Sequence, residues 1–241
     1  MFKSALLKII YSKIDLAFYP GERSKAYFKK YGVEKSKLRW LPHAIDNNRF
    51  SEPRLEKARA IRENLGLKET DILFLFAGKL DNNKNPEILV RAFEQVQLEN
   101  AYLLIVGNGE KEVYLRSLVT DHRIYFADFQ NQGQLPEYYQ ACDVFCLPSK
   151  SETWGLGVNE AMSCGKAILI SDKVGCGPDL VENGENGYIF KSNDQHDLAD
   201  KMAALNDRKK IDIFGRNSLR KIADFSFSKQ VEIISEELRK I

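Results

Sequence analysis

Short apolar runs alternate with amphipathic segments along most of the chain. Runs of strand length, bounded by Gly, Pro or polar residues, predict strands at 72–77, 101–106, 123–127, 143–147, 166–170 and 187–190. Helical periodicity lies between and after them, at 85–96, 110–118, 135–141, after Gly157, near 178–182, and at 197–205, 208–222 and 229–240.

This alternation predicts an α/β fold with a parallel sheet that is covered by helices on both faces. Six strands in this arrangement favour the doubly wound, Rossmann-like order 3-2-1-4-5-6, in which the first and fourth strands are neighbours. A ligand crevice is expected where the order reverses, at the carboxyl ends of those two strands.

Residues 1–41 predict a separate and incomplete piece of structure. A helix at 1–12, a strand at 14–19, a helix ending at Gly32 and a strand at 37–41 are too few elements to bury both faces of a sheet. We therefore expect a partial βα remnant of another domain at 1–41, an extended linker at 42–50, and a second domain at 51–241. Apolar positions of the remnant are expected to be exposed: Leu6, Ile9, Ile10, Leu16, Phe18 and Trp40.

Composition narrows the class of protein. The 241 residues include 36 basic and 34 acidic side chains, a net charge of +2, so no bulk attraction to nucleic acid is implied. The four cysteines have no metal-ligand spacing and lie in or beside apolar segments, which favours reduced thiols in a cytoplasmic protein. No apolar run is long enough to span a membrane.

Polar residues follow the first and fourth predicted strands. The loop after 72–77 carries Lys79 and Lys84, and the loop after 143–147 carries Glu152 and a Gly-rich turn into a helix with Glu160. The start of a helix offers unpaired N–H groups and a positive dipole end, which together with two lysines suits a diphosphate. Since phosphate would repel a carboxylate, Glu160 is expected to bind neutral hydroxyl groups. The alternative is a set of solvated loop charges.

Four segments together resemble the C-terminal half of GT-B glycosyltransferases of family four, the glycosyl transferases of group 1. These segments are FAGKL with a later Lys, LLIVGNG, DVFCLPSxxExxGLxxxEAMxCG and GxDLVENGENGYIF. The likeness runs from about Ser12 to the C-terminus and is most specific over 73–206. LPHAIDNNRF is similar to the linker between that family's two domains.

The resemblance implies a donor site for a nucleoside-diphosphate sugar. Lys79 and Lys84 match the basic pair that holds the diphosphate, Glu152 matches the residue on the donor sugar, and Glu160 matches the residue on the ribose. With Lys79, Lys84 and Glu152 as the catalytic set, the implied donor-binding residues are Gly78, Lys79, Lys84, Asp128, Phe129, Gln130, Glu152, Thr153, Trp154, Gly155, Leu156 and Glu160.

The family's reaction retains the anomeric configuration, by front-face attack in which the leaving phosphate oxygen takes the acceptor's proton. The resemblance thus implies a hexosyltransferase-like enzyme of polysaccharide biosynthesis that needs no metal or other cofactor. Its acceptor would be a glycan or a lipid-linked glycan, and membrane contact would be at most peripheral, on the inner face. Because the family's acceptor domain is represented only by its last elements, we expect weak activity without a separate N-terminal half or a homodimer.

One departure from the family's motif and three alternative interpretations remain. Lys79 stands where many members have arginine, which keeps the charge but loses the fork geometry. The chain is alternatively a binding protein for nucleotide sugars without transfer, or a truncated remnant of a full-length transferase. An NAD-binding protein is less favoured, because Gly107 and Gly109 supply only two of the fingerprint's three glycines.

Overall fold

The computed structural model describes residues 2–240 and divides the chain into two compact units. Residues 1–45 and 224–241 form the first unit, and residues 46–223 form the second. The sequence instead placed the boundary at 42–50 and kept the last residues with the second domain. The origin of residues 1–41 in an acceptor domain stays a prediction.

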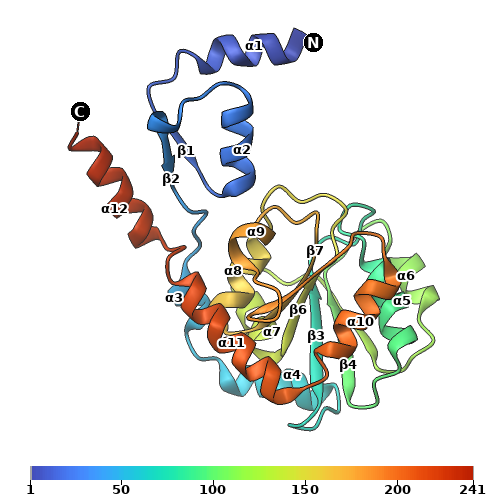
Figure 1. Ribbon diagram of the computed structural model, residues 1–241. Helices are drawn as coiled ribbons and strands as arrows, with labels where there is room; N and C mark the ends of the chain where they lie inside the picture. Colours follow the sequence, from blue (N-terminus) through green and yellow to red (C-terminus); the bar gives the residue numbers. More distant parts are fainter. Residues whose placement is uncertain (1, 241) are drawn as a thin grey trace. The chain divides into compact units, whose positions relative to one another are not determined.

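Within the described part of the second unit lies a parallel sheet of six strands (Figure 1). Its order, β5-β4-β3-β6-β7-β8, confirms the predicted order 3-2-1-4-5-6 and the α/β class. The strands are β3 (Ile72–Ala77), β4 (Ala101–Val106), β5 (Ile124–Ala127), β6 (Val144–Leu147), β7 (Ala167–Ser171) and β8 (Gly187–Phe190).

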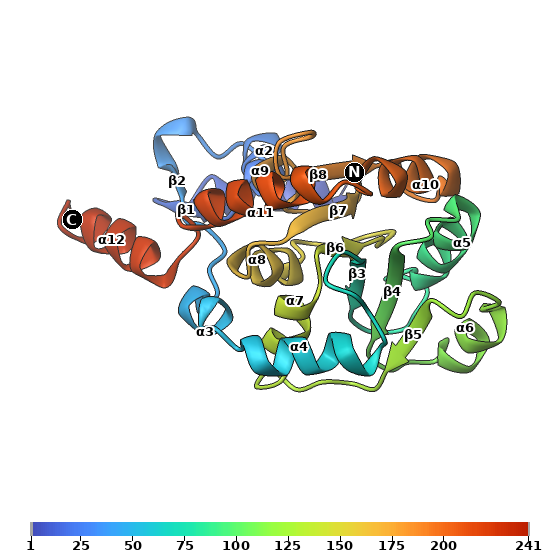
Figure 2. The same ribbon diagram turned by 90° about the horizontal axis from the view of Figure 1, so that it is seen from below.

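Helices cover both faces of this sheet. Figures 1 and 2 show α5, α6 and α10 on one face and α4, α7 and α8 on the other. The helices of the unit are α3 (Asn47–Ser51), α4 (Leu55–Asn64), α5 (Pro86–Val96), α6 (Glu112–Leu118), α7 (Leu135–Ala141), α8 (Leu156–Ser163), α9 (Gly177–Leu180), α10 (Gln195–Ala204) and α11 (Arg208–Ile222). Ile72, Phe74 and Phe76 pack in one core cluster with residues of α5 and α10, and the intervening Leu73 and Leu75 are equally buried. Burial on both faces explains why the strands read as continuous apolar runs.

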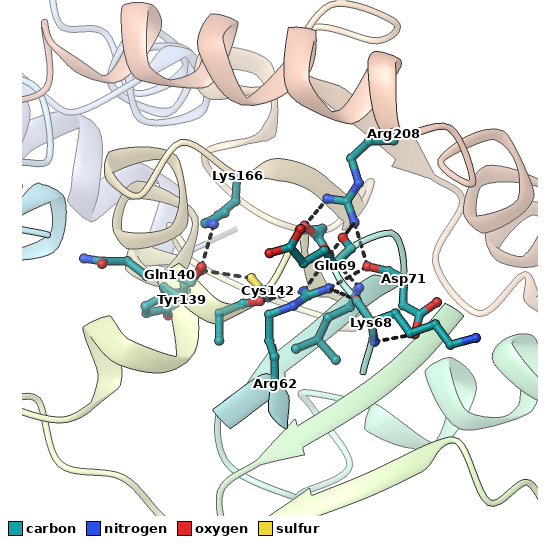
Figure 3. A network of polar contacts seen from close by, with 12 residues as sticks. Arg62, Lys68, Glu69, Asp71, Tyr139, Gln140, Cys142, Lys166 and Arg208 are labelled. Atoms are coloured by element: carbon teal, nitrogen blue, oxygen red, sulfur yellow. Dashed lines mark hydrogen bonds and ion pairs between the residues drawn. The ribbon is translucent and has the colours of Figure 1, made fainter. Parts of the chain in front are cut away.

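A polar network lies at the end of the sheet where β3 and β6 begin (Figure 3). Asp143, just before β6, accepts hydrogen bonds from the Leu73 amide at 2.7 Å and from Arg62 at 3.0 Å. Arg208 of α11 pairs with the same carboxylate, and both arginines also reach the Asp71 carbonyl, each at 2.6 Å. This network ties α4 and α11 to the sheet.

The first unit contains a pair of parallel strands, β1 (Ala17–Tyr19) and β2 (Leu38–Trp40). Its other elements are α1 (Phe2–Tyr11), α2 (Glu22–Lys30), the 3-10 turn η1 (Lys35–Lys37) and α12 (Phe227–Leu238). Leu6, Ile9 and Ile10 on α1 are exposed, as predicted. Leu16, Phe18 and Trp40 are half-buried, so the prediction that they are exposed holds only in part for these three.

Contacts with distant residues explain why α12 belongs to this unit. Glu237 forms an ion pair with Arg39 at 2.9 Å, and the Gln230 amide donates to the Pro42 carbonyl at 2.6 Å. The ring of Trp40 packs edge-to-face on Phe225 at 5.5 Å. Gln230 and Pro42 are 188 positions apart in the sequence. Local periodicity could not predict contacts between residues so far apart.

The expectation of a wholly extended linker is wrong. Helix α3 begins at Asn47, and the Asp46 side chain caps it by accepting a hydrogen bond from the Arg49 amide at 3.2 Å. An Asp before two Asn residues is an N-cap signal, and the predicted hinge overlooked it.

Candidate functional site

The exit loops of β3 and β6 meet at the carboxyl edge of the sheet, as the strand order predicted. The Lys150 amide donates to the Asn83 carbonyl at 2.7 Å, and the Asn83 side chain donates to the Ser151 carbonyl at 2.7 Å. In addition, the Lys84 ammonium forms a close ion pair with the Glu152 carboxylate. The loops are thus joined by both backbone and charge.

A cavity of about 410 Å³ opens beside this junction. Its walls come from the ends of β3 and β4, the loop after β5, and helices α7 and α8. The lining residues are Ala77, Gly78, Lys79, Val106, Gly107, Asn108, Phe129, Gln130, Leu135, Tyr139, Gly157 and Glu160. Five of the predicted donor-site residues therefore share one cavity: Gly78, Lys79, Phe129, Gln130 and Glu160.

Close backbone approach shapes the floor of this cavity. Gly107 has φ 136°, and a Cβ atom there would lie 2.0 Å from the Gly78 carbonyl oxygen. Only glycine fits a backbone of this conformation at this distance. The motif LLIVGNG therefore has a steric role, since it lets the loops after β3 and β4 touch.

The two predicted lysines differ in their surroundings. Lys79 is exposed at the cavity wall, whereas Lys84 is half-buried in its pair with Glu152. The backbone of Glu152 is also held, since its amide donates to the Lys173 carbonyl at 3.3 Å. Lys84 and Glu152 do not line the cavity that contains Lys79. The structure thus places one lysine in the cavity and the other beside it.

Helix α8 begins at Leu156 behind Gly155, whose φ of 101° turns the chain sharply into the helix. No side chain of the described residues caps this helix start. Trp154 is buried, and its indole N–H donates to the Asn159 side chain at 2.9 Å. The Trp154 ring therefore supports the turn from inside, while the side chains of Thr153 and Leu156 are exposed.

Glu160 lies one turn into α8, and its carboxylate has a partner that sequence reasoning missed. The buried Tyr139 hydroxyl of α7 donates to Glu160 Oε2 at 2.8 Å. Burial raises the pKa of Glu160, while the Tyr139 hydrogen bond and the positive charge of Arg49 act in the opposite direction. In the sequence, the only sign of this partner is an aromatic residue on the preceding helix. Such a residue is usually interpreted as part of the hydrophobic core.

Arg49 was also missed, because it lies in the supposed linker. Its guanidinium donates to the Gln132 side chain at 3.3 Å and to the Gln132 carbonyl. Arg49 thereby anchors the loop after β5, which contains Asp128, Phe129 and Gln130. Phe129 in this loop is 64% exposed, so its ring is open to a planar ligand. Asp128 is exposed but lies outside the cavity lining.

A sequence profile described as "Glycosyl transferases group 1" matches residues 57–221, more than half of the chain. The chain belongs to this family. Among the relatives of this group 1 protein is UDP-Gal:alpha-D-GlcNAc-diphosphoundecaprenol alpha-1,3-galactosyltransferase of Escherichia coli, 28% identical over 228 residues. That match covers 90% of this chain and 57% of the relative.

A second relative, D-inositol 3-phosphate glycosyltransferase of Xylanimonas cellulosilytica, is 28% identical over 195 residues, which are 76% of this chain and 46% of the relative. This chain therefore spans about half the length of the curated relatives it matches. HepE of Anabaena, solved in complex with UDP, has a TM-score of 0.83 at 21% identity, over 100% of this chain and 69% of that chain. This likeness shows the Rossmann-like fold of one GT-B half.

Within residues 2–240, no group of three His, Cys, Asp or Glu side chains is arranged to hold a metal ion. No described helix combines the length and apolar character needed to cross a membrane. The expectations on cofactors and on peripheral membrane contact stay predictions.

Proposed function

We propose that this chain is the donor-binding half of a retaining group 1 glycosyltransferase that takes a nucleoside-diphosphate sugar. One observation carries the proposal. The cavity at the switch point brings together a held carboxylate, Glu160, an exposed cation, Lys79, and an exposed ring, Phe129. These groups match the ribose, the diphosphate and the base of a nucleotide.

The nucleoside would occupy the cavity, with its ribose at Glu160 and its base beside Phe129 and Gln130. The diphosphate would extend past Lys79 toward the start of α8, where free amides and the helix dipole favour negative charge. The donor sugar would then lie near Glu152 and Lys84. In this arrangement the Lys84–Glu152 pair opens or shifts so that each group meets the donor.

During transfer, the bond from the anomeric carbon to the phosphate oxygen breaks, and a bond to the acceptor oxygen forms on the same face. The proton of the acceptor hydroxyl passes to the leaving phosphate oxygen. Negative charge grows on the diphosphate, and positioned lysines stabilise that charge in the transition state. A double displacement would need two carboxylates about 5–5.5 Å apart around the sugar. That route would remove Glu160 from its proposed ribose role.

The acceptor of this proposal is a glycan or lipid-linked glycan in polysaccharide biosynthesis, handled on the cytoplasmic side. The matches cover only 57% and 46% of the two relatives, and the remainder of such proteins could supply an acceptor-binding wall. We propose that such a wall reaches the donor site from more of the same chain, from a second copy or from a separate N-terminal half.

A thermal-shift panel tests the proposed donor. UDP is the first ligand to test, since the name of the Escherichia coli relative contains UDP-Gal and HepE was solved with UDP. ADP, GDP and their glucose conjugates complete the panel. A ligand at 100 times its Kd stabilises the folded state by about 2.7 kcal/mol. If no nucleoside diphosphate or nucleotide sugar raises the Tm, the proposed function is wrong.

A further inference from the structure

We propose that Tyr139 is a positioning residue of the donor site, which holds the Glu160 carboxylate in the orientation that receives ribose hydroxyls. The Tyr139 hydroxyl occupies one lone pair of Oε2 at 2.8 Å, so the remaining lone pairs of the carboxylate are left for a ligand in the cavity. This inference rests on the proposed function, because it needs a ribonucleotide in that cavity.

Packing fixes the position of the Tyr139 ring. The side chain is 1% exposed, and its ring meets Phe50 at 5.9 Å and Phe145 at 5.3 Å, both edge-to-face. Gly157 gives α8 room to approach, since a Cβ atom there would lie 3.1 Å from the Tyr139 hydroxyl oxygen. The hydroxyl therefore has a single defined position beside Glu160.

The chemistry of the hydroxyl points to a role beyond packing. A phenylalanine would fill the same apolar space without a polar group to satisfy, and a buried hydroxyl is costly unless it is hydrogen-bonded. Within residues 2–240, the carboxylate at the cavity wall is the partner of this hydroxyl. The hydroxyl of Tyr139 thus holds a residue that lines the proposed ligand cavity.

Burial keeps Tyr139 a donor, and two neighbouring groups favour the ionised form of Glu160 that accepts from it. Burial raises the pKa of Tyr139 well above its usual range, so the hydroxyl keeps its proton. Burial also raises the pKa of Glu160, and the Tyr139 hydrogen bond is the first of the two influences that oppose this rise. The second is Arg49 of α3. Lys79 shares the cavity, and Cys164 at the end of α8 stays neutral because burial raises its pKa to about 12.

Calorimetry with the variant Tyr139→Phe tests the inference, with UDP and 2′-deoxy-UDP as the probes. Wild-type protein should bind UDP more tightly than 2′-deoxy-UDP. The variant should bind UDP about tenfold more weakly, as expected for one hydrogen bond to a charged group, and 2′-deoxy-UDP with a smaller loss. Tyr125→Phe is the matched control, since that hydroxyl donates to the Leu65 carbonyl outside the cavity.

A pH series separates positioning from a general loss of structure. The preference for UDP should fade as the pH falls through the pKa of Glu160, and in Tyr139→Phe it should fade at a higher pH. The double variant with Glu160→Gln should show no further loss from removal of the Tyr139 hydroxyl. These three results together support the inference.

The failures are distinguishable. If wild-type protein binds UDP with a ribose preference that Tyr139→Phe retains at every pH, the positioning role is wrong and the proposed function stands. If wild-type protein binds no nucleotide, the proposed function is wrong and this inference is lost with it. Circular dichroism and the Tm of each variant establish that the binding data come from folded protein, and Glu160→Gln keeps the question testable if Tyr139→Phe does not fold.

Discussion

At the scale of single residues, the two lysines of the candidate site differ in exposure and in pairing. Lys79 is exposed at the cavity, whereas Lys84 is engaged by Glu152 across the junction of two loops. An exposed lysine meets a diphosphate at little cost, while a paired lysine must first exchange a carboxylate for the ligand. The two residues should therefore contribute unequally to the binding free energy of a diphosphate, although the sequence motif assigns both of them the same role.

Replacement of both lysines by alanine should weaken binding of a nucleoside diphosphate by roughly 2–4 kcal/mol, if each charge-assisted contact contributes about 1.5 kcal/mol. Lys79→Ala alone should account for the larger share, because the Lys84 contact is offset by loss of its pair with Glu152. Calorimetry measures both. Lys191→Ala is the control, since that side chain is 77% exposed and lies outside the cavity. Unchanged affinity in the double variant would exclude this cavity as the diphosphate site.

Glu160 should make the protein less stable at neutral pH. Its pKa in the folded state is raised, chiefly by burial, above the value in the unfolded chain. The ionised carboxylate therefore costs stability above the folded-state pKa, and this cost disappears as the pH falls below the unfolded value. Glu160→Gln, which keeps an acceptor for Tyr139, should raise the Tm at pH 7 and lose that advantage near pH 4. A Tm difference independent of pH would contradict this account.

At the scale of elements, stability and ligand binding lie at opposite ends of the sheet. The cavity opens at the carboxyl ends of β3 and β4, and the network around Asp143 lies where β3 and β6 begin. Figure 3 shows the side chains of Arg62 and Arg208 meeting in this network, and these residues belong to α4 and α11. The carboxylate is 12% exposed, so it stabilises the fold as a nearly buried charge with several donors.

Asp143→Ala should lower the free energy of unfolding by about 2–4 kcal/mol, because two arginines and the Leu73 amide lose an acceptor. The nucleotide Kd should stay the same, since Asp143 lies at the other end of β6 from the cavity. Denaturant unfolding and calorimetry measure the two quantities. Glu112→Ala, which removes an exposed pair with Arg116, should cost less than about 1 kcal/mol. A changed Kd with unchanged stability would contradict this separation.

At the scale of the whole molecule, the first unit exposes apolar side chains that resemble an unfinished interface. Ile9 on α1 and Val231 on α12 are each 64% exposed. Other exposed apolar residues of the two helices are Leu6, Ile10, Phe227, Ile234 and Leu238. Large exposed apolar side chains, when they gather in a patch, mark surfaces that bind other chains, and each of these two helices is a candidate for such a surface.

The purified chain should bind donor but transfer sugar at a rate near background. Holding donor and acceptor together can lower the activation barrier of transfer by roughly 7–11 kcal/mol. A donor site alone does not provide this positioning. Light scattering should show self-association, or a complex when a separate N-terminal half is added. Substitution of Ile9 and Val231 by serine should abolish that association, whereas Val113→Ser in the second unit, 83% exposed, should not. A monodisperse monomer with full turnover would disprove this prediction.

The sequence by itself determined the strands, their order and the position of the cavity at the switch point, because these depend on local periodicity and on short motifs. The strand at 72–77 and the turn at Gly155 can each be recognised from a few neighbouring residues, and so can the motif around Glu152 and Glu160 on which the predicted site rests. The doubly wound order follows from right-handed crossovers between parallel strands, which leave few alternatives.

Only the tertiary structure decided which side chains act together. Tyr139 and Glu160 are 21 positions apart, Lys84 and Glu152 are 68 apart, and Arg49 and Gln132 are 83 apart. The return of α12 to the first unit likewise depends on partners near Arg39 and Pro42. Such contacts form because packing brings distant elements together, and no local pattern of hydrophobic and polar residues records which ones will meet.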